Sequence, residues 1–506
     1  MSLDTTSTAV LLSCAAALVV AKVVKDRRRL PLPPGPTGLP FIGNALQMPV
    51  DHEWIKFAAW GKEYGGIVHV SVFGQPIIIL NSITAINDLF EKRSGIYASR
   101  PTLPMAGELV GYDVSPPLIV SGNRHREYRK LMHVGLAPHK MESYSPIQEQ
   151  KMKDFLHSLL TAPNRLSHNI RRVVAAVVFQ ISHGYEVKGD EDPLVVLADQ
   201  ATYEFSMASS PGSFFVDLLP ILKYVPAWFP GAGFQKTAQA WRKNAMRLRD
   251  EPYYVVKDQV ARGVAVPSFT SNLIEKNPNA TKEEEDIYKW ASTAFYSGGA
   301  DTTVSAIHSF FLAMVLYPEV QKKAREEVDR VVGSNRLPGF KDREALPYIE
   351  AVVKEVLRWN PVAPLALPHK ATQDDVYEGY HIPAGTILFG NTWGIFKNPD
   401  IYASPDDFIP ERFLDKVANV PDPRSFAFGY GRRICPGQHL ADASLYLAIV
   451  STLSLFDITN AIDKTTGEPI VPVPKYSAGL INHPADFECL IKPRYSETET
   501  LAYLGK

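Results

Sequence analysis

Hydrophobic positions along the chain fall into two kinds of pattern. Apolar and polar residues alternate through Ile67–Phe73, and a second apolar run, Ile77–Leu80, follows a short segment that contains glycine and proline. Alternation interrupted by turn-forming residues predicts a β-hairpin in a small sheet. By contrast, Tyr288–Leu316 is apolar over most of its length. This stretch predicts one long buried helix.

Near the N-terminus, the apolar run Ala9–Val24 is followed at once by the basic cluster Lys25–Arg29. The run is short against the roughly 20 residues that cross a bilayer, but Lys22 can extend to the interface. The positive charges after the run predict a membrane anchor with a cytosolic body. A cleaved signal peptide is the alternative, because Ala15–Ala17 are small. Asp4 and the lack of a basic residue before the run argue against a signal peptide.

Prolines divide the next part of the chain. Pro31–Pro36 cannot form helix or sheet and predicts a stiff spacer between the anchor and the body. Tyr97–Gly122 is mostly irregular, which is typical of a binding loop or lid. Helical patterns through residues 145–290 are broken near Pro211–Pro230, where Phe214–Phe229 is unusually apolar. That stretch is either buried core or a lid partly inserted into a membrane.

Composition narrows the class of protein without naming a function. Of the 506 residues, 45% are hydrophobic and 21% are charged, which describes an ordinary globular protein with a large core. The formal net charge of −1 gives no support for a nucleic-acid partner. The three cysteines, Cys14, Cys435 and Cys489, do not make a disulfide framework and favour a reducing compartment.

The candidate chemistry centres on Cys435, which lies at the predicted start of a helix. Pro436 suits the first helical position, and the apolar run Leu440–Ile449 follows it. Unpaired N–H groups and the dipole at a helix start favour the thiolate form of a cysteine. Gly431 and Gly437 allow a flat partner to approach closely. A buried structural cysteine is one interpretation, and a cysteine-ligated metal cofactor, with haem as the leading candidate, is the other.

Five positions favour the cofactor: Phe428, Gly431, Arg433, Cys435 and Gly437 fit the pattern Phe-x-x-Gly-x-Arg-x-Cys-x-Gly. This stretch resembles the haem-binding signature of the cytochromes P-450, the haem-thiolate monooxygenases. The resemblance implies haem b with the Cys435 thiolate as axial ligand of the iron, and it places Phe428, Arg433 and Gly437 in the cofactor site. It also implies a mainly α fold with a small β-rich lobe.

The centre of the long predicted helix carries a second motif, Gly298–Thr303. Alone, glycines and polar residues there are explained by a helix–helix contact with a polar kink. Beside the haem signature, the segment resembles the family's Ala/Gly-Gly-x-Asp/Glu-Thr-Thr/Ser oxygen-activation motif. The match implies that Gly298 and Gly299 leave room for dioxygen. It further implies that Thr302 hydrogen-bonds the dioxygen while Asp301 relays protons as a general acid.

A third resemblance concerns charged residues. Glu355 and Arg358 lie one helical turn apart and, taken alone, are an ordinary surface pair. Phe408–Phe413 resembles the family segment that adds an arginine, here Arg412, to that pair. The resemblance therefore implies a structural role for these three charges in the core that holds the haem. Between them, Pro361–Pro368 is extended by its prolines and predicts a strand that lines the pocket.

The residues expected at the haem propionates follow the family less closely. Arg129, in the basic start of a helix at Arg124–Lys130, matches a family arginine. His125 stands where family members usually carry a tryptophan four residues before that arginine. An imidazole can still donate a hydrogen bond to a carboxylate. His369 matches another position whose side chain often binds a propionate.

The implied activity is the insertion of one atom of dioxygen into a C–H bond of a lipophilic compound. Electrons from NADPH are expected through a separate reductase, because the chain has no flavin or nicotinamide motif. The pattern of Asp375–Trp393 resembles basidiomycete members of specialised metabolism, which favours a terpenoid and then an aromatic compound or alkaloid. The alternatives are a sterol demethylase, a haem-thiolate isomerase, dehydratase or peroxygenase, and a haem sensor. An intact acid–alcohol pair, Asp301 and Thr302, disfavours the isomerase class.

The expected organisation has three parts. Residues 1–30 form a single-pass anchor in the endoplasmic reticulum membrane with a basic stop. Residues 31–38 form a proline-rich spacer whose position resembles the hinge of microsomal family members. Residues 39–506 form one cytosolic haem-thiolate domain.

Overall fold

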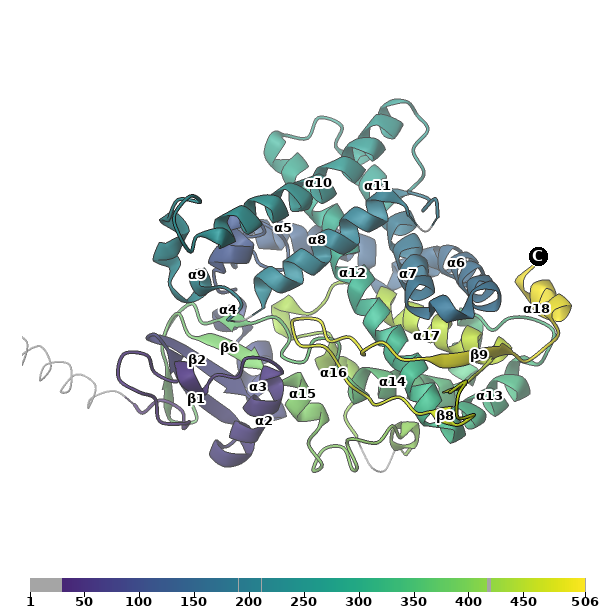
Figure 1. The fold of residues 1–506 in the computed structure, drawn as a ribbon. Helices are drawn as coiled ribbons and strands as arrows, with labels where there is room; N and C mark the ends of the chain where they lie inside the picture. Colours follow the sequence, from purple (N-terminus) through teal and green to yellow (C-terminus); the bar gives the residue numbers. More distant parts are fainter. Residues whose placement is uncertain (1–29, 190, 211, 416–419, 506) are drawn as a thin grey trace, which may run out of the picture.

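The computed structural model describes residues 30–189, 191–210, 212–415 and 420–505. Helices make up most of the molecule, and a small sheet lies at one end beside the first described residues (Figure 1). The expected class, mainly α with a small β-rich lobe, is therefore confirmed. The predicted membrane anchor falls on residues 1–29, outside the part of the chain that the structure describes.

The described helices follow one another along the whole chain. They are α2 (Glu53–Tyr64), α3 (Ile83–Ile86), α4 (Ser94–Tyr97), α5 (Asn123–Leu136), α6 (Met141–Thr161), α7 (Leu166–His183), α8 (Pro193–Ser209), α9 (Phe215–Leu218), α10 (Gly233–Ala261), α11 (Phe269–Lys276), α12 (Lys282–Leu316), α13 (Pro318–Val332), α14 (Pro347–Trp359), α15 (Thr392–Phe396), α16 (Arg424–Ala427), α17 (Gln438–Leu455) and α18 (Glu497–Leu504).

The strands form three small sheets. They are β1 (Ile67–Val72), β2 (Gln75–Leu80), β3 (His369–Lys370), β4 (Asp375–Tyr377), β5 (Tyr380–Ile382), β6 (Ile387–Gly390), β7 (Phe456–Ile462), β8 (Pro469–Ile470) and β9 (Cys489–Pro493). The sheet orders are β1-β2-β6-β3, β4-β5 and β8-β7-β9. Only β2 and β6 run parallel, which joins the predicted hairpin to a segment about three hundred residues later in the chain.

The predicted hairpin is confirmed, with its turn one residue earlier than expected. Val72 pairs with Gln75, so Phe73 and Gly74 form the connection. Both residues have positive φ angles, +48° and +81°, as a two-residue turn that matches the strand twist requires. The hairpin therefore closes tightly and presents β2 to β6.

Helix α12 runs through the centre of the molecule (Figure 1) and contacts α5, α7, α8, α10, α14 and α17. It begins six residues before the predicted start, because Thr281 and Glu284 form a capping box. Pro318 follows its last residue by two positions. Among the described helices, α12 alone is long and apolar enough to span a membrane, but 78% of its apolar window is buried in the protein. It is a core helix.

The proline-rich segment after residue 30 has no helix or strand, as expected, but it is bonded to the sheet region. The carbonyl of Pro34 accepts from the backbone N–H of His69 at 2.8 Å, and that of Pro31 accepts from His381 at 2.8 Å. A Cβ on Gly35 would lie 1.9 Å from the carbonyl oxygen of His69. Only glycine permits this close approach, so the segment lies directly against the sheet.

The predicted strand at Pro361–Pro368 is wrong. These residues form turns, and regular pairing begins only at His369 in β3. Prolines lack the N–H that a strand ladder needs, and Ala366 adopts a φ of +51° while its N–H bonds to the carbonyl of Ala363. The segment nevertheless lines the central cavity, as the prediction required.

Glu355 and Arg358 form a fully buried ion pair rather than a surface pair. Nε and Nη2 of Arg358 donate to the two carboxylate oxygens of Glu355 at 2.7 and 2.8 Å. Arg412 donates from Nε to Oε1 of Glu355 at 3.3 Å, and the N–H of Ile409 donates to the same oxygen at 2.7 Å. The remaining nitrogen of Arg358 donates to the carbonyls of Phe396 and Pro405. This network joins α14 to the long loop that precedes α16.

We predict that Glu355→Gln destabilises the holoprotein by about 3–5 kcal/mol, because the neutral amide leaves two buried guanidinium groups without a counter-charge. Urea unfolding followed by far-UV circular dichroism measures the change. Glu127→Gln is the matched control, since Glu127 pairs with Lys130 at the same spacing but at 3.8 Å and on the surface. A loss for Glu355→Gln as small as that of the control would contradict a structural role for the network.

Candidate active site

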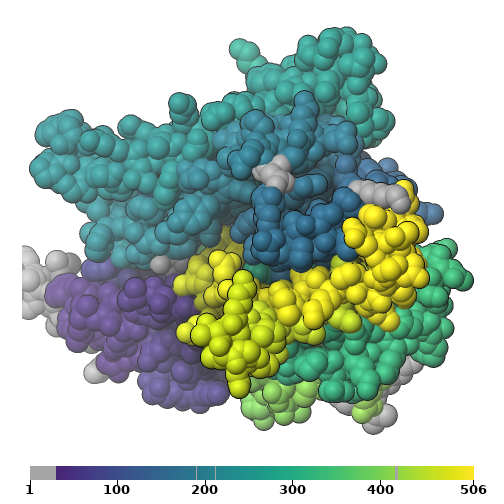
Figure 2. All heavy atoms as spheres, turned by 45° about the vertical axis from the view of Figure 1, so that its right-hand side comes forward, coloured from purple at the N-terminus to yellow at the C-terminus, as the bar shows by residue number. Residues whose placement is uncertain are grey.

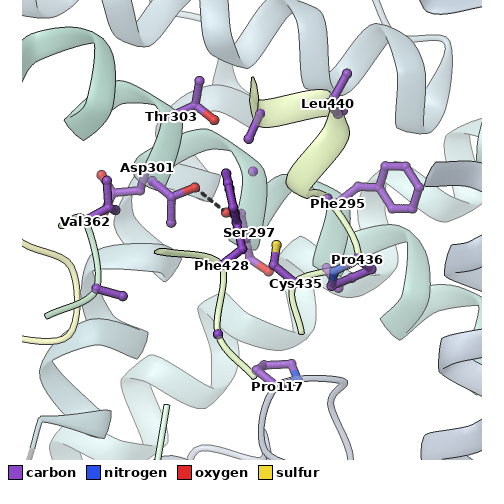
Figure 3. Close-up of a pocket in the computed structure, with 18 of the residues that line it drawn as sticks. Pro117, Phe295, Ser297, Asp301, Thr303, Val362, Phe428, Cys435, Pro436 and Leu440 are labelled. Atoms are coloured by element: carbon purple, nitrogen blue, oxygen red, sulfur yellow. Dashed lines mark hydrogen bonds between the residues drawn. The ribbon is translucent and has the colours of Figure 1, made fainter. Parts of the chain in front are cut away.

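A cavity of about 370 Å³ lies between α12 and the loop that precedes α17. Its walls come from α5, α7, α8, α12 and α17, from the turns at residues 362–367, and from the loop around Pro117. Figure 3 shows Cys435, Phe428 and Pro436 on one side and Ser297 and Asp301 of α12 on the other. The two motifs that the sequence singled out therefore meet at one cavity.

The loop that carries Cys435 is fixed by its backbone. The N–H of Cys435 donates to the carbonyl of Phe428 at 2.8 Å. Gly431 has a φ of +55°, and a Cβ there would lie 2.0 Å from the carbonyl oxygen of Phe90. A side chain at this position would push the loop away from Phe90, so the glycine sets where the sulfur lies.

One expectation about the surroundings of Cys435 is wrong. Helix α17 begins at Gln438 with Gly437 as its N-cap, so Pro436 precedes the helix instead of opening it. In the protein alone, burial raises the pKa of the Cys435 thiol, although the N–H of Gly437 and the charge of Arg129 oppose this effect. Desolvation therefore outweighs the helix start. A bound metal cation reverses this balance, because a coordinated thiol is deprotonated.

Cations surround the cavity near Cys435. Arg433 donates from Nε to the carbonyl of Ala98 and from Nη2 to that of Ile119, both at 2.6 Å. Its Nη1 is buried and has no partner among the described residues. Arg129 donates from Nη1 to the carbonyl of Ile434 at 2.6 Å. Burial, with the charge of Arg129, lowers the pKa of Arg433 to about 10.

Arg100 joins this group and was not predicted from the sequence. Its Nη1 donates to the carbonyls of Leu367 and Pro368 at 2.7 and 2.8 Å, and its pKa is lowered by burial and by the charge of Arg433. No local motif marks Arg100, whose carbonyl partners are Pro117 and a segment more than 260 residues away.

The two histidines lie where the resemblance expected them, at the cavity wall. Burial, together with the charges of Arg433 and Arg129, lowers the pKa of His125 to about 4. His125 is therefore neutral near pH 7 and keeps one N–H to donate. His369 stacks on Phe90 with ring centroids 4.0 Å apart and donates from Nδ1 to the carbonyl of Tyr97 at 2.8 Å.

Together these groups fit an anionic cofactor beside a soft metal ligand. No carboxylate among the described residues forms an ion pair with Arg100, Arg129 or Arg433, and one nitrogen of Arg433 lacks any partner. Burying cations without a counter-charge costs free energy, so a bound carboxylate would stabilise them. The propionates of a haem are such carboxylates, and the sulfur of Cys435 would face its iron.

The α12 side of the cavity carries the acid and the alcohol. Oγ1 of Thr302 donates to the carbonyl of Gly298 at 2.7 Å. A Cβ on Gly298 would meet no atom within 4 Å, whereas one on Gly299 would lie 3.5 Å from Val178. Gly298 therefore borders open space, while Gly299 faces α7.

Asp301 is bonded on both carboxylate oxygens. Nη1 of Arg171 donates to Oδ1 at 3.3 Å, and Nε2 of His483 donates to Oδ2 at 3.0 Å. Burial raises the pKa of Asp301, but the hydrogen bond and charge of His483 and the charge of Arg171 outweigh it, so the net pKa is lowered. Asp301 is therefore ionised near pH 7. Neither partner was predicted, because each lies more than 125 residues away in the sequence.

A mainly helical protein with a cysteine facing an acid–alcohol pair across a cation-rimmed cavity belongs to the class of cysteine-ligated haem proteins. Residues 33–487 match the family model for cytochrome P450. The chain belongs to the cytochrome P450 family.

Its relatives include cytochrome P450 monooxygenase 208 of Postia placenta, which is 46% identical over 98% of this chain and 96% of that protein. The chain is also similar to monooxygenase claR of Ampulloclitocybe clavipes (42% identical over 94% of this chain and 89% of that protein) and to monooxygenase ppsD of Aspergillus oryzae (41%, 96% and 92%). The chain is thus a fungal-type cytochrome P450 monooxygenase, an oxidoreductase of a family that uses haem b with a cysteine thiolate as axial ligand.

We predict that Cys435→Ala loses bound haem or leaves haem without a thiolate ligand, because no other cysteine lines the cavity wall in the described residues. Haem content and the spectrum of the reduced, carbon monoxide-bound protein measure this. Cys489→Ala is the matched control, since Cys489 is also partly buried but lies in β9. A normal spectrum for Cys435→Ala would overturn its assignment as the iron ligand.

Proposed function

We propose that this chain is a membrane-bound haem-thiolate monooxygenase that hydroxylates a lipophilic small molecule in fungal specialised metabolism. Members of its family require a redox partner and bind lipophilic substrates. The reductase is expected to be a separate, NADPH-dependent chain. The observation that carries the proposal is the pairing of Cys435 with Asp301 and Thr302 across one mainly apolar cavity.

Haem b, when bound, supplies oxygen activation and the transfer of one oxygen atom to a C–H bond. Thr302 donates a hydrogen bond from its hydroxyl to the carbonyl of Gly298, which leaves its oxygen free to accept a hydrogen bond from a protonated group in the cavity. Asp301 is ionised at rest, so it needs a proton from outside the cavity before it can act as a general acid.

The residues that line the cavity support the proposal that the substrate is a terpenoid. An aromatic compound or an alkaloid is the next candidate class. Valines of α7 and Phe205 of α8 provide apolar surface without charge. Two buried polar atoms at the wall, Oγ1 of Thr202 and Nε1 of Trp290, have no partner among the described residues. A mainly hydrocarbon substrate that carries an oxygen atom would satisfy such groups.

The proposal is tested by expressing the chain with a fungal reductase in yeast and feeding terpenoid, aromatic and sterol precursors. A new product heavier by one oxygen atom is expected from a terpenoid, as detected by mass spectrometry. Oxidation of a sterol alone would favour the demethylase alternative. An isomer or dehydrated product formed without NADPH would favour the isomerase class.

We predict that Thr302→Ala lowers the amount of product formed per NADPH consumed, because the hydroxyl that can accept a hydrogen bond is lost. Product and NADPH are measured in the same reaction. Thr302→Ser keeps the hydroxyl and is expected to restore most of the coupling. Equal coupling in Thr302→Ala and the unmodified enzyme would exclude a role for this hydroxyl in oxygen activation.

Exposed apolar residues support the proposed location at the endoplasmic reticulum membrane. Of the two interpretations of residues 214–229, the membrane lid is favoured over the buried core, because Phe215, Ile221, Tyr224 and Trp228 are 71–79% exposed. In Figure 2 the teal part of the chain that contains this segment projects on the same side as the purple N-terminal part. Exposed apolar side chains gathered in one segment are typical of membrane contact.

We predict that Trp228 enters the lipid phase when the full-length protein is reconstituted in nanodiscs. Brominated acyl chains are expected to quench part of the tryptophan fluorescence, and Trp228→Phe is expected to remove most of that quenching. Trp359→Phe is the control, because Trp359 is buried in α14. Quenching that is the same in Trp228→Phe as in the unmodified protein would contradict insertion of this segment.

A further inference from the structure

Asp301 is connected to the outside of the protein by its two partners. The Asp301 side chain is 19% exposed and lines the cavity. The side chains of His483 and Arg171 are 22% and 42% exposed, and neither lines the cavity. Both partners of Asp301 therefore keep side-chain surface that solvent reaches. The three residues make a polar path through a wall that is otherwise mainly apolar.

The two partners of Asp301 differ in what they can do with a proton. A guanidinium group stays charged at any working pH, so Arg171 can orient the carboxylate but cannot give it a proton. An imidazole gains and releases protons in the physiological range. Of the two groups that touch the carboxylate, His483 alone can therefore pass a proton to it.

We propose that His483 is a positioning and proton-relay residue for Asp301. The proposal rests on the monooxygenase function, since that reaction consumes protons in the cavity. The Nε2 proton of the His483 imidazolium passes to Oδ2 of Asp301, which gives a neutral imidazole and a carboxylic acid. Asp301 then releases the proton on the cavity side, and His483 takes another from water at its exposed edge. Arg171 holds Oδ1 throughout.

Other charged groups around His483 do not replace it. On its own loop lies Asp486, on α12 lies His308, and on α7 and α8 lie His168 and Asp199. Burial lowers the pKa of His308 to about 4, even though Asp486 acts in the opposite direction, so His308 carries no spare proton near pH 7. Burial raises the pKa of Asp199, which accepts a hydrogen bond from Tyr296 at 3.5 Å and does not contact Asp301 directly in any described bond.

The relay is tested by measuring turnover of the full-length enzyme with its reductase. The substrate is the compound of the terpenoid, aromatic and sterol panel from which the unmodified enzyme makes an oxygenated product. His483→Gln keeps a hydrogen-bond donor but cannot carry a proton. We expect product formation to fall about tenfold, a part of the 10²–10⁴ that positioned proton transfer contributes, and the solvent deuterium isotope effect to rise. Substrate affinity is expected to stay the same.

His381→Gln is the matched control, because His381 also lies beside a carboxylate, Asp374 at 3.4 Å, but does not line the cavity. It is expected to leave rate and isotope effect unchanged. If His483→Gln forms product more slowly but its solvent deuterium isotope effect does not rise, His483 has only a structural role and the relay is overturned. The relay is also overturned if His483→Gln has the same rate of product formation and the same isotope effect as the unmodified enzyme.

A second measurement does not depend on turnover or on how well His483→Gln folds. The ring signals of ¹³C-labelled histidines are recorded in the reduced, carbon monoxide-bound protein. We expect Asp301→Asn to change the chemical shifts of one histidine ring, because its Nε2 no longer donates to a carboxylate. Unchanged ring signals would overturn the contact. If the unmodified enzyme oxidises no panel compound, the proposed function fails. The ring signals still show whether a histidine contacts Asp301.

Discussion

Two buried arginines and one half-buried arginine around one end of the cavity set the main constraint on this protein. Arg100, Arg433 and the half-buried Arg129 donate to backbone carbonyls, which neutralise no charge. The polypeptide alone therefore keeps several positive charges in a poorly solvated region. An anionic cofactor relieves that cost, so binding of the cofactor and stability of the fold are linked. The buried Glu355 network achieves the same balance within the chain, because its carboxylate is supplied by α14.

The cavity has two ends with opposite electrostatic characters. Near Cys435, burial and neighbouring cations hold His125 neutral. One nitrogen of Arg433 there has no partner among the described residues, so this end of the cavity favours an anion. At α12, Asp301 lines the cavity, and its ionised form is stabilised by Arg171 and His483. A carboxylate can act as a general acid only after a proton reaches it from outside the cavity. The hydrogen bond from His483, which helps to stabilise the charge of Asp301, also provides the path for that proton.

Local pattern predicted the features that depend on local chemistry. The hairpin at β1 and β2 and the long helix α12 follow from the periodicity of apolar residues, whereas the meeting of two motifs at one cavity was implied by the family resemblance. The errors came from competing physical effects. At Pro361–Pro368 the prolines remove ladder donors and Ala366 turns the chain, so extension does not become a strand. At Pro436, the helix start lies later than predicted, because Gly437 is the N-cap of α17.

Residues that act across the fold could not be predicted in the same way. Arg100, Arg171 and His483 have no motif of their own, and each becomes significant only because a distant segment packs against it. His483 lies in an irregular loop before β9, where a single histidine is usually a surface residue. Its proximity to Asp301 depends on how that loop crosses α12. Haem ligation is therefore encoded in one continuous stretch of sequence, whereas proton supply is assembled from three separate elements by the packing of the whole domain.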